Sequence, residues 1–289
     1  MLIKILLYKY VLKWIPDFFW IKFQFRRKVG YWPNLNNPKT FNEKLQWLKL
    51  HDRNPLYTKL VDKYEVKSII AKQIGEEYVI PTLGIWHKFD DIDFDKLPNQ
   101  FVLKCTHDSG GLVIVKDKSK FNVNAARTKI NNCLKMNYYW ALREWPYKNV
   151  KPRIIAEKYM EDESGYELKD YKVFCFNGVP KALFIATDRG IHETKFDFFD
   201  ADLKHIPMKQ HYPNNPNIKV PDSEGIHKMF ELACILTKNF KHCRADFYNI
   251  NGRIYFGELT FSHFSGMQAM EPAEWDEKFG SWLDLGNDI

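Results

Sequence analysis

The chain has 289 residues, of which 45% are hydrophobic and 27% charged, so it has the composition of a globular protein able to bury a core as one large domain or as two or three small ones. Its five cysteines are odd in number and form no CxxC pair, and its histidines show no HxxxH or HExxH spacing. This argues against a disulfide framework and a zinc site, and for reduced thiols in a cytosolic compartment. The net charge of +7 is compatible with a nucleic acid, an anionic membrane or a polyanionic substrate and selects none of them.

Residues 1–30 are apolar and aromatic, with lysines in between and the cluster Arg26-Arg27-Lys28 at the end. They contain no run of about 18 uncharged apolar residues and no small-residue cleavage site, so neither a transmembrane helix nor a signal peptide is expected. Pro16 divides the stretch into two short predicted helices. Residues 1–28 could rest on the inner face of an anionic membrane as a peripheral, interfacial helix, or they could pack on the body of the protein as an arm. Of these two interpretations we prefer the packed arm.

Two helices are predicted after this stretch. Thr40 is a candidate cap for the first, and Glu43, three residues later, completes the pattern of a capping box. The second is predicted over residues 56–74, where Gly75 would stop it. Its lysines are typical of a solvated helix face: Lys59, Lys63, Lys67 and Lys72.

A possible phosphate-binding flap follows. Residues 78–86 predict entry into a short strand, and residues 101–107 and 112–116 predict two strands joined by the turn Asp108-Ser109-Gly110-Gly111. Glycines in such a turn let backbone N–H groups approach phosphate oxygens closely, and Lys104 would point from the first strand toward the turn. The GKS/T tail of a Walker A motif is absent, and an ordinary hairpin is the alternative interpretation.

The middle of the chain alternates predicted strands and helices. Asn124 to Trp145 is predicted to be helical, residues 153–160 a strand, residues 170–189 a hairpin around Asn177-Gly178, and residues 195–207 a strand and a turn. A loop over residues 209–222, a helix capped by Ser223 and running to about Phe240, and a short amphipathic helix over residues 272–285 complete the prediction.

A second hairpin carries the residue types that chemistry would need. Residues 245–250 and 253–261 are rich in Tyr, Phe and Ile, and Asn251-Gly252 between them is typical of a type I′ turn. Asp246 and Glu258 each lie roughly six residues from the turn centre, so we expect their side chains to meet on one face of the two strands.

Two carboxylates on one face repel each other unless a cation lies between them, so the pair predicts Mg²⁺, which prefers carboxylate and phosphate oxygens. Arg244, two residues before Asp246, is expected on the same side, where it could hold an anion. The alternative is a surface hairpin with solvated acids. If the metal site is real, replacing either acid by its amide is expected to leave stability equal or higher, because repulsion in the metal-free protein is relieved.

Taken in order, these motifs resemble the ATP-grasp superfamily. They are a lysine-bearing strand with a glycine turn, a strand ending in Glu157-Lys158-Tyr159-Met160, the DYKVFCFNG hairpin, and RADFY followed by YFGELTF. The best match is the TupA-like branch, which is linked with teichuronopeptide and capsular or other surface polysaccharide synthesis and is often labelled glycosyltransferase. The resemblance runs from NPKTFNEKLQWLKLHDRNPLYTKLVDKYEV to EWDEKFGSWLDL, almost the whole chain.

The resemblance implies an α+β ATP-grasp fold in which two α+β subdomains clamp ATP. It implies a helical, aromatic-rich N-terminal region over residues 1–55 and an ATP-grasp domain over residues 56–285, with a flap subdomain at about 100–160 and a C-terminal catalytic subdomain at 161–285. In such enzymes ATP, with Mg²⁺, activates a carboxylate as an acyl phosphate that an amine then attacks. The implied partners are small-molecule carboxylates and amines, with no nucleic acid.

Site residues are carried over position by position. Lys63 and Lys104 look like the two phosphate-contacting lysines, and His107, Ser109 and Gly110 match the flap. Glu157, Lys158 and Met160 match the strand that binds adenine, largely through its backbone, and Asp170 occupies the ribose-binding position. Arg244 matches the arginine that steadies the transferred phosphoryl group, and Asp246 and Glu258 match the Mg²⁺ ligands; Arg244 and Lys104 would be the catalytic residues.

Three positions depart from the branch. Thr106 and Asp108 replace the usual Asn and Gly of the flap, and an acid beside ATP phosphates puts phosphate affinity or flap closure in doubt. Thr260 stands where many ATP-grasp enzymes have a metal-binding Asn. His263-Phe264 replaces a more usual proline-containing turn, which would alter the loop on the acceptor side.

These observations favour an ATP- and Mg²⁺-dependent carboxylate–amine ligase that joins an amino acid or amino sugar to a uronic-acid-type carboxylate. The alternative enzyme is a glycosyltransferase that uses a nucleotide sugar, for which Asp200-Ala201-Asp202 offers a DxD triplet. A non-enzymatic alternative is a membrane-docked adaptor with a decayed ATP site, for which Asp108 is the main support.

Overall fold

The computed structural model describes residues 10, 12–108, 110–165, 167–188, 193–215, 217–220 and 222–286. Contacts divide the chain into two compact units. The first consists of the described residues up to Asp17 together with Arg53–Ile69 and Val79–Met160, and the second of Phe18–Asp52, Ile70–Tyr78 and the described residues from Glu161 onward. The domain limits predicted from the sequence stay a prediction, and each unit is described by itself.

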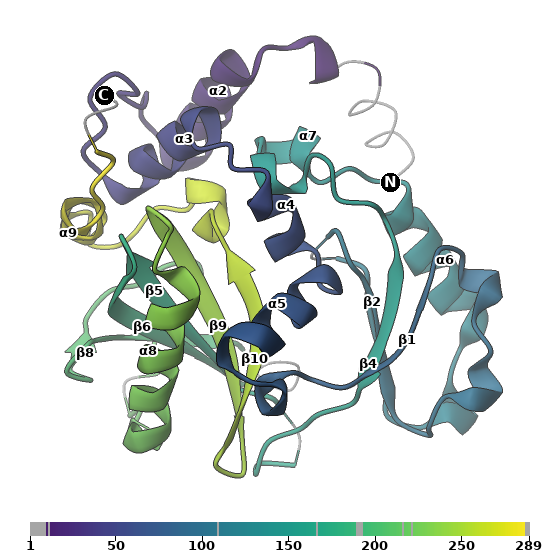
Figure 1. Cartoon of the computed structure of the whole chain (residues 1–289). Helices are drawn as coiled ribbons and strands as arrows, with labels where there is room; N and C mark the ends of the chain where they lie inside the picture. The colour runs from purple at the N-terminus through teal and green to yellow at the C-terminus, as the bar shows by residue number, and fades with distance from the viewer. Residues whose placement is uncertain are drawn as a thin grey trace. The chain divides into compact units, whose positions relative to one another are not determined.

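The first unit is built on a four-stranded antiparallel sheet of strand order β1-β4-β2-β3. Its strands are β1 (Thr82–Trp86), β2 (Phe101–Cys105), β3 (Leu112–Val115) and β4 (Ile154–Lys158), and its helices are α4 (Leu56–Val61), the start of α5 (Glu65–Ile74), α6 (Val123–Leu134) and α7 (Tyr139–Leu142). Ala126 and Ile130 of α6 pack into one core with alternate residues of the strands, among them Leu103 and Ala156, so α6 covers one face of the sheet (Figure 1).

The second unit is built on a six-stranded antiparallel sheet of order β10-β9-β5-β6-β7-β8. Its strands are β5 (Asp170–Phe176), β6 (Val179–Thr187), β7 (Lys195–Asp200), β8 (His205–Ile206), β9 (His242–Ile250) and β10 (Arg253–Thr260). Its helices are α2 (Asp17–Val29), whose first residue belongs to the first unit, α3 (Phe41–His51), α8 (Ser223–Thr237) and α9 (Glu274–Trp282). The α+β class predicted from the sequence is therefore confirmed.

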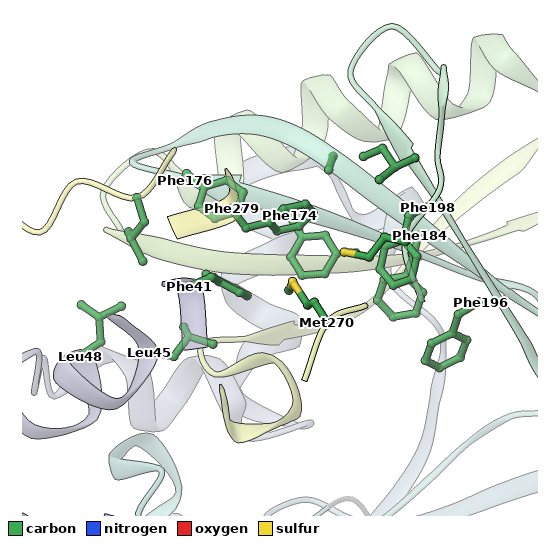
Figure 2. Close-up of a cluster of buried hydrophobic side chains, with 14 of the residues drawn as sticks. Phe41, Leu45, Leu48, Phe174, Phe176, Phe184, Phe196, Phe198, Met270 and Phe279 are labelled. Atoms are coloured by element: carbon green, nitrogen blue, oxygen red, sulfur yellow. The ribbon is translucent and has the colours of Figure 1, made fainter. Parts of the chain in front are cut away.

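An aromatic core holds α3 and α9 against the larger sheet (Figure 2). Phe41 of α3 and Phe279 of α9 are fully buried beside Phe174 of β5, with ring centroids 5.4–6.3 Å apart. Such edge-to-face aromatic packing adds about 0.5–1.5 kcal/mol per pair beyond the area that it buries. α8 contacts β5, β6 and β9. β5, one of the strands that carry the polar residues discussed below, thus packs against α3 and α9 through this core and also contacts α8.

Short 3₁₀ turns fill several connections, at Leu12–Trp14, Glu76–Tyr78, Phe89–Asp91, Phe94–Lys96, Lys118–Lys120, Trp145–Tyr147 and His263–Gly266. The helix predicted after Pro16 is confirmed as α2, whereas most of the stretch before Pro16 lies outside the described residues. Among the helices of the described residues, none is long and apolar enough to cross a membrane.

Several predicted boundaries are wrong, and polar side chains explain why. The predicted helix over 56–74 is interrupted because Asp62 Oδ1 accepts the backbone N–H groups of Tyr64 and Glu65 and starts α5 anew. The predicted helix over 124–145 is likewise interrupted, since Asn137 Oδ1 accepts the N–H of Tyr139. The cap of α8 is Asp222 rather than Ser223. These side chains satisfy helix N–H groups that would otherwise lack a partner.

The structure confirms the capping box of α3, the type I′ turn predicted at Asn251-Gly252 and the hairpin predicted around Asn177-Gly178. The Thr40 side chain accepts the N–H of Glu43, and the Glu43 side chain accepts that of Thr40. Asn177-Gly178 and Asn251-Gly252 have positive φ values of 49°, 80°, 53° and 80°, as a type I′ turn requires.

Candidate active site

In the first unit, Lys104 and Glu157 lie on the sheet face opposite α6. Their neighbours Leu103 and Ala156 point into the core with α6, and side chains alternate along a strand. Lys104 Nζ lies 2.6 Å from Glu157 Oε2, and Lys67 Nζ of α5 lies 2.5 Å from Glu157 Oε1. Leu112 and Ile114 of β3 pair with Lys104 and Val102 of β2, and both are exposed. The face therefore combines exposed apolar side chains with a paired lysine.

Glu157 is held as a carboxylate inside the protein. Burial alone would raise its pKa, but the ammonium groups of Lys104 and Lys67 outweigh burial and lower the pKa from 4.5 to about 2. Burial lowers the pKa of Lys67, while Glu157 acts in the opposite direction. The side chain of Lys67 is only 13% exposed, so the interpretation of this lysine as part of a solvated helix face is wrong.

The flap between β2 and β3 is tied down at its base. Lys63 donates its backbone N–H to the Thr106 carbonyl and its ammonium to the Asp108 carbonyl. The His107 ring is buried, and its Nε2 lies 3.2 and 3.1 Å from the carbonyl oxygens of Cys133 and Met136. The His107 side chain therefore fastens the flap to the end of α6, and only its backbone is left to meet a nucleotide.

Asp108 does not present its acid to the outer side of the flap. Its Oδ1 accepts the N–H of Gly111 at 3.0 Å, and the residue is buried. A Cβ on Gly111 would lie 2.6 Å from Cys105 Sγ, so this turn needs glycine there. A Cβ on Gly110 would meet nothing within 4 Å, and Ser109 lies outside the described residues. The Asp108 carboxylate is thus engaged within the flap turn, and its effect on phosphate affinity stays a prediction.

The end of β4 is less open than the adenine assignment implies. β4 is an interior strand between β1 and β2, so its backbone groups are used in the sheet. The N–H of Lys158 is taken as well, since it donates to the Pro81 carbonyl at 3.0 Å. Met160, two residues beyond Lys158, follows the strand.

In the second unit, Asp246 of β9 and Glu258 of β10 stand opposite each other, as predicted. A register shift between Phe256 and Glu258 marks a β-bulge at Gly257. In a regular hairpin with this turn, Asp246 would face Gly257, and Glu258 would point to the other side of the sheet. The extra residue brings Glu258 to the side of Asp246. A Cβ on Gly257 would lie 3.1 Å from the Asp246 carbonyl, which favours glycine at the bulge.

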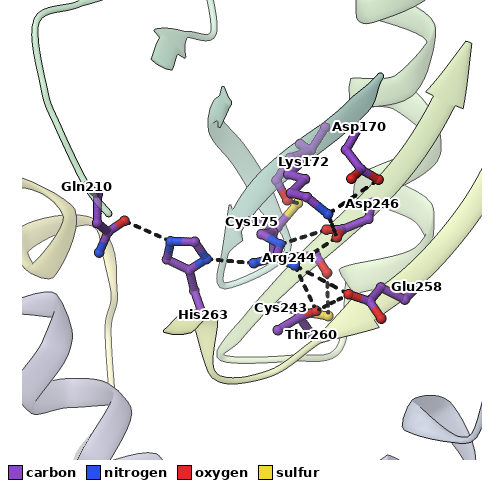
Figure 3. A network of polar contacts seen from close by, with 11 residues as sticks. Asp170, Lys172, Cys175, Gln210, Cys243, Arg244, Asp246, Glu258, Thr260 and His263 are labelled. Carbon is purple, nitrogen blue, oxygen red and sulfur yellow. Dashed lines mark hydrogen bonds and ion pairs between the residues drawn. The ribbon is translucent and has the colours of Figure 1, made fainter. Parts of the chain in front are cut away.

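Asp246 is surrounded by cations (Figure 3). Arg244 donates from Nε to Oδ1 and from Nη2 to Oδ2, both at 2.7 Å, and Lys172 of the neighbouring β5 donates to Oδ2 at 2.5 Å. Burial would raise the pKa of Asp246, but Arg244 and then Lys172 outweigh it, so the pKa lies below its ordinary value. Asp170 Oδ1, on the same face, lies 3.5 Å from Lys172 Nζ. Carboxylate repulsion is therefore not the dominant force here.

Arg244 is a buried hub rather than an open anion site. Its guanidinium also donates to Thr260 Oγ1 at 3.1 Å, lies 3.5 Å from Glu258 Oε1, and contacts His263 Nδ1 at 2.6 Å. Because arginine has no acceptor, His263 accepts at Nδ1 and carries its proton on Nε2, which donates to Gln210 Oε1 at 2.8 Å. Burial and the Arg244 cation hold the pKa of His263 well below its usual range, so the ring is neutral.

Sequence reasoning missed Lys67, Lys172, His263 and Gln210 as members of these clusters. Lys172 could have been found, because it alternates with Asp170 in DYK and so shares its face. Gln210 could not, because it comes from a segment that had been assigned to a loop.

The residues at the hairpin fit a magnesium ion of the phosphate-bound kind. Mg²⁺ is commonly held by one or two carboxylates together with substrate phosphates and water. Glu258 supplies one exposed carboxylate, and Asp246 supplies a second, buried one whose two oxygens already accept from Arg244 and Lys172. The Glu258 side chain is 41% exposed, so one ligand is open to a nucleotide. No group of three or more His, Cys, Asp or Glu side chains suited to a metal occurs among the residues that the structure describes. A metal here would thus depend on ligands from a nucleotide.

The DxD triplet has a local structural role. Asp200 ends β7, and its Oδ1 accepts the N–H groups of Asp202 and Lys204, both at 2.9 Å. This carboxylate shapes the turn between β7 and β8, which does not favour its use as a nucleotide-sugar metal ligand.

The sequence matches the model of a known protein family. A family model described as TupA-like ATPgrasp matches residues 43–284. The comparison with curated proteins finds no match.

Similar solved structures include three complexes with ATP or ADP. D-alanine–D-alanine ligase from Bacillus anthracis, complexed with ATP, is 18% identical over 70% of this chain and 54% of that chain, with a TM-score of 0.41. The ADP complex of purK, N5-carboxyaminoimidazole ribonucleotide synthetase, is 16% identical over 78% and 52%, with a TM-score of 0.46. ATP-grasp ligase PsnB, complexed with minimal precursor, Mg and ADP, is 10% identical over 76% and 57%, with a TM-score of 0.40. The chain thus spans between 52% and 57% of the length of these enzymes.

Proposed function

The chain belongs to the TupA-like ATP-grasp family, whose members are ATP-dependent ligases, and from this we propose that it joins a carboxylate to an amine with ATP and Mg²⁺. A carboxylate oxygen would attack the γ-phosphorus of ATP, forming an acyl phosphate and releasing ADP. The amine nitrogen would then attack the carbonyl carbon, and inorganic phosphate and a proton would leave as the C–N bond forms. We assign the carboxylate to a uronic-acid-type sugar and the amine to an amino acid or amino sugar in surface polysaccharide synthesis.

One observation carries the proposal: Asp246 and Glu258 are opposite each other at the bulge of the β9–β10 hairpin, with two cationic side chains within 3.5 Å of these acids. Bound Mg²⁺ would neutralise phosphate charge and orient the γ-phosphate. Asp246 and Glu258 would hold it. Arg244 positions Asp246, and Lys172, which is more exposed than Arg244, is the better candidate to face the transferred group.

The first unit is proposed to bind the nucleotide through its lysines and its flap. Lys104 and Lys63 would contact phosphate oxygens, together with backbone N–H groups of the flap from His107 to Gly110. Glu157 would act as a positioning residue that holds the Lys104 ammonium on the sheet face.

The base and the ribose would be bound by other groups. Because the Lys158 N–H already donates to Pro81, we place the backbone contact to adenine at Met160. The exposed side chains of Leu112 and Ile114 offer an apolar surface for the base. Asp170 is retained as the candidate for the ribose hydroxyls.

We place this reaction in the cytoplasm, with small-molecule partners and without nucleic acid. The support is that Cys105, Cys133, Cys175, Cys234 and Cys243 are all free thiols, as a reducing compartment maintains them. The glycosyltransferase alternative is less favoured, because its DxD triplet forms a turn. The adaptor alternative loses its main support, because the Asp108 carboxylate is directed into the flap turn.

The reaction is tested with purified protein, Mg-ATP, pooled amino acids and amino sugars, and pooled uronic acids. We expect ADP release only when a uronic acid is present, and inorganic phosphate and an amide product when an amine is added. Hydroxylamine in place of the amine should trap the acyl phosphate as a hydroxamate. Release of a nucleoside diphosphate from a nucleotide sugar without ATP would instead establish the glycosyltransferase. No turnover in either assay, with Mg-ADP bound, would rule out these carboxylates as substrates.

Nucleotide binding is tested separately by thermal unfolding. Mg-ADP at about 100 times its dissociation constant should stabilise the native protein by about 2.7 kcal/mol. Lys104→Met should weaken this stabilisation, because a phosphate-facing ammonium is lost. Lys59→Met is the matched control, since Lys59 is an exposed lysine of α4 in the same unit. Equal stabilisation of all three proteins would remove Lys104 from the site, and no stabilisation of the wild type would contradict nucleotide binding itself.

A further inference from the structure

α2 has a buried face and an exposed aromatic face. Ile21 and Phe25 are fully buried and Gln24 nearly so, which fixes one side of the helix to the protein. On the other side Phe19 is 65% and Phe23 52% exposed, and Phe18 is also exposed. At 100° per residue these phenylalanines fall on a single half of the helix. Neither sequence interpretation of this stretch is complete, because the helix packs on the protein and also presents apolar rings to the outside.

The exposed half also carries positive charge. Lys22, Arg26 and Arg27 fall between or beside the phenylalanines on the same half of the helix, and Lys22 Nζ lies 5.2 Å from the centroid of the Phe18 ring. No Asp or Glu occurs from residue 18 to residue 32. Just after the helix, Tyr31 and Trp32 are exposed as well. An aromatic surface is therefore interleaved with cations and free of acids.

We propose that this surface, defined as Phe18, Phe19, Lys22, Phe23, Arg26 and Arg27, docks on an anionic lipid bilayer with the α2 axis parallel to the membrane. The phenylalanine rings enter the boundary between headgroups and acyl chains, and the lysine and arginines contact anionic headgroups. The attachment would be peripheral, because the opposite half of α2 is buried in the protein. The proposal is independent of the ligase activity.

The charge pattern of this surface favours a membrane over a second copy of the chain or a nucleic acid. A second copy of the same face would bring like charges together without any acid to pair them. A nucleic acid would use the cations, but sequence-tolerant binding to it also relies on a groove that follows the backbone, whereas this surface is one half of a single helix. An anionic bilayer can bind the phenylalanine rings and the cations at the same time. The sequence before the helix, MLIKILLYK, has the same combination of apolar residues and lysines.

The test is co-sedimentation of the full-length protein with vesicles of phosphatidylcholine alone or of phosphatidylcholine mixed with phosphatidylglycerol. We expect at least tenfold tighter binding to the anionic vesicles at about 0.1 M salt. Most of it should be lost at about 1 M salt, where the screening length falls from about 10 Å to about 3 Å.

Two variants test the contributions of the phenylalanines and of the cations separately. Phe19→Ser/Phe23→Ser should weaken binding to anionic vesicles at least tenfold, and Lys22→Gln/Arg26→Gln/Arg27→Gln should abolish the preference for anionic lipid. Matched controls are Ile235→Ser, an apolar side chain of α8 that is 53% exposed, and Lys204→Gln, a lysine that is 77% exposed. Both controls should bind like the wild type. Unchanged unfolding temperatures and Mg-ADP stabilisation would show that the α2 variants are folded.

Other outcomes would overturn the proposal. Equal binding of the wild type and the phenylalanine variant to anionic vesicles would remove α2 from the interface. A lower unfolding temperature in that variant would mean that the rings are packed inside the protein. A concentration-dependent dimer that the phenylalanine variant loses, or binding to RNA in the absence of vesicle binding, would assign the surface to a different partner.

Discussion

Asp246→Asn is expected to lower the free energy of unfolding by about 3–5 kcal/mol and to abolish Mg²⁺-dependent ATP turnover, whereas Glu258→Gln should abolish turnover with little loss of stability. The two acids face each other across one hairpin, yet their surroundings differ. Asp246 is 1% exposed and binds Arg244 and Lys172, while Glu258 is 41% exposed and lies 3.5 Å from Arg244. One charge is part of a buried network and the other is largely solvated.

The structure contradicts the premise of the expectation that either amide would leave stability equal or higher, and for Asp246 we therefore expect a loss. The expectation assumed that two carboxylates repel each other, but Arg244 donates two hydrogen bonds to Asp246, and Lys172 donates a third. An amide in this position removes the nearest counter-charge of Arg244 and Lys172, although Glu258 and Asp170 still lie 3.5 Å from them, and this loss is larger than any relief of carboxylate repulsion. For Glu258, a partly exposed pair is worth at most about 1 kcal/mol, so the change should be small.

Urea unfolding of each variant and ATP turnover with the identified substrates provide the measurements. Turnover should fall about a hundredfold or more in both variants, because each removes an anionic ligand for the metal. Lys172→Met added to Asp246→Asn removes one of the uncompensated cations and should recover part of the stability, but no turnover. An Asp246→Asn protein as stable as the wild type would contradict the charge network. Wild-type turnover in Glu258→Gln would contradict the metal site.

The proximity of Asp246 and Glu258 was predicted from the sequence, but by an incomplete argument. Counting residues from Asn251-Gly252 in a regular hairpin pairs Asp246 with Gly257, so the two acids would lie on opposite faces. The bulge at Gly257 corrects the register. A glycine inside a strand pattern is itself an indication of a bulge, so the sequence contains this information.

Local signals predicted the hairpin turns and the cap of α3, but not the cap of α8 or the long-range partners. The Thr40 and Glu43 capping box depends on residues three apart, and the structure contains it. The partners of Lys67 could not be found that way, because Glu157 is distant in sequence and meets it only after β4 has joined the sheet. A lysine at helical spacing from other lysines is usually solvated, and tertiary contact overrides that pattern here.

In the first unit, Glu157→Gln is expected to be as destabilising as the change at Asp246. The Glu157 carboxylate is the common partner of Lys67 and Lys104, at 2.5 and 2.6 Å. Removing the only negative charge of this triad leaves two neighbouring ammonium groups, one of them only 13% exposed. A loss of about 3–5 kcal/mol is typical when one partner of a buried ion pair is removed. Nucleotide affinity should fall too, because Lys104 loses the group that positions it.

Lowering the pH should reduce the difference in the free energy of unfolding between Glu157→Gln and the wild type. The pKa of Glu157 is lowered from 4.5 to about 2 in the folded protein, equivalent to about 3 kcal/mol. A depressed folded pKa contributes stability above the unfolded value, and this contribution is lost as the pH falls from about 4.5 toward about 2. The variant has no carboxylate to protonate at this position. Its free energy of unfolding therefore lacks this contribution to the loss of stability in acid.

Unfolding free energies at pH 7 and at several acidic pH values measure both effects. Asp90→Asn is the matched control: Asp90 lies in the same unit and pairs with Arg127, but its side chain is 70% exposed, so stability should change by less than about 1 kcal/mol. Lys67→Met combined with Glu157→Gln should restore part of the lost stability, because it removes the less exposed of the two ammonium groups that the carboxylate had paired. If Glu157→Gln instead matched the wild type at pH 7, or if the difference between them stayed constant down to the lowest pH, the buried carboxylate would not be holding the two lysines. Lys104 would then need another partner to hold its ammonium on the sheet face opposite α6.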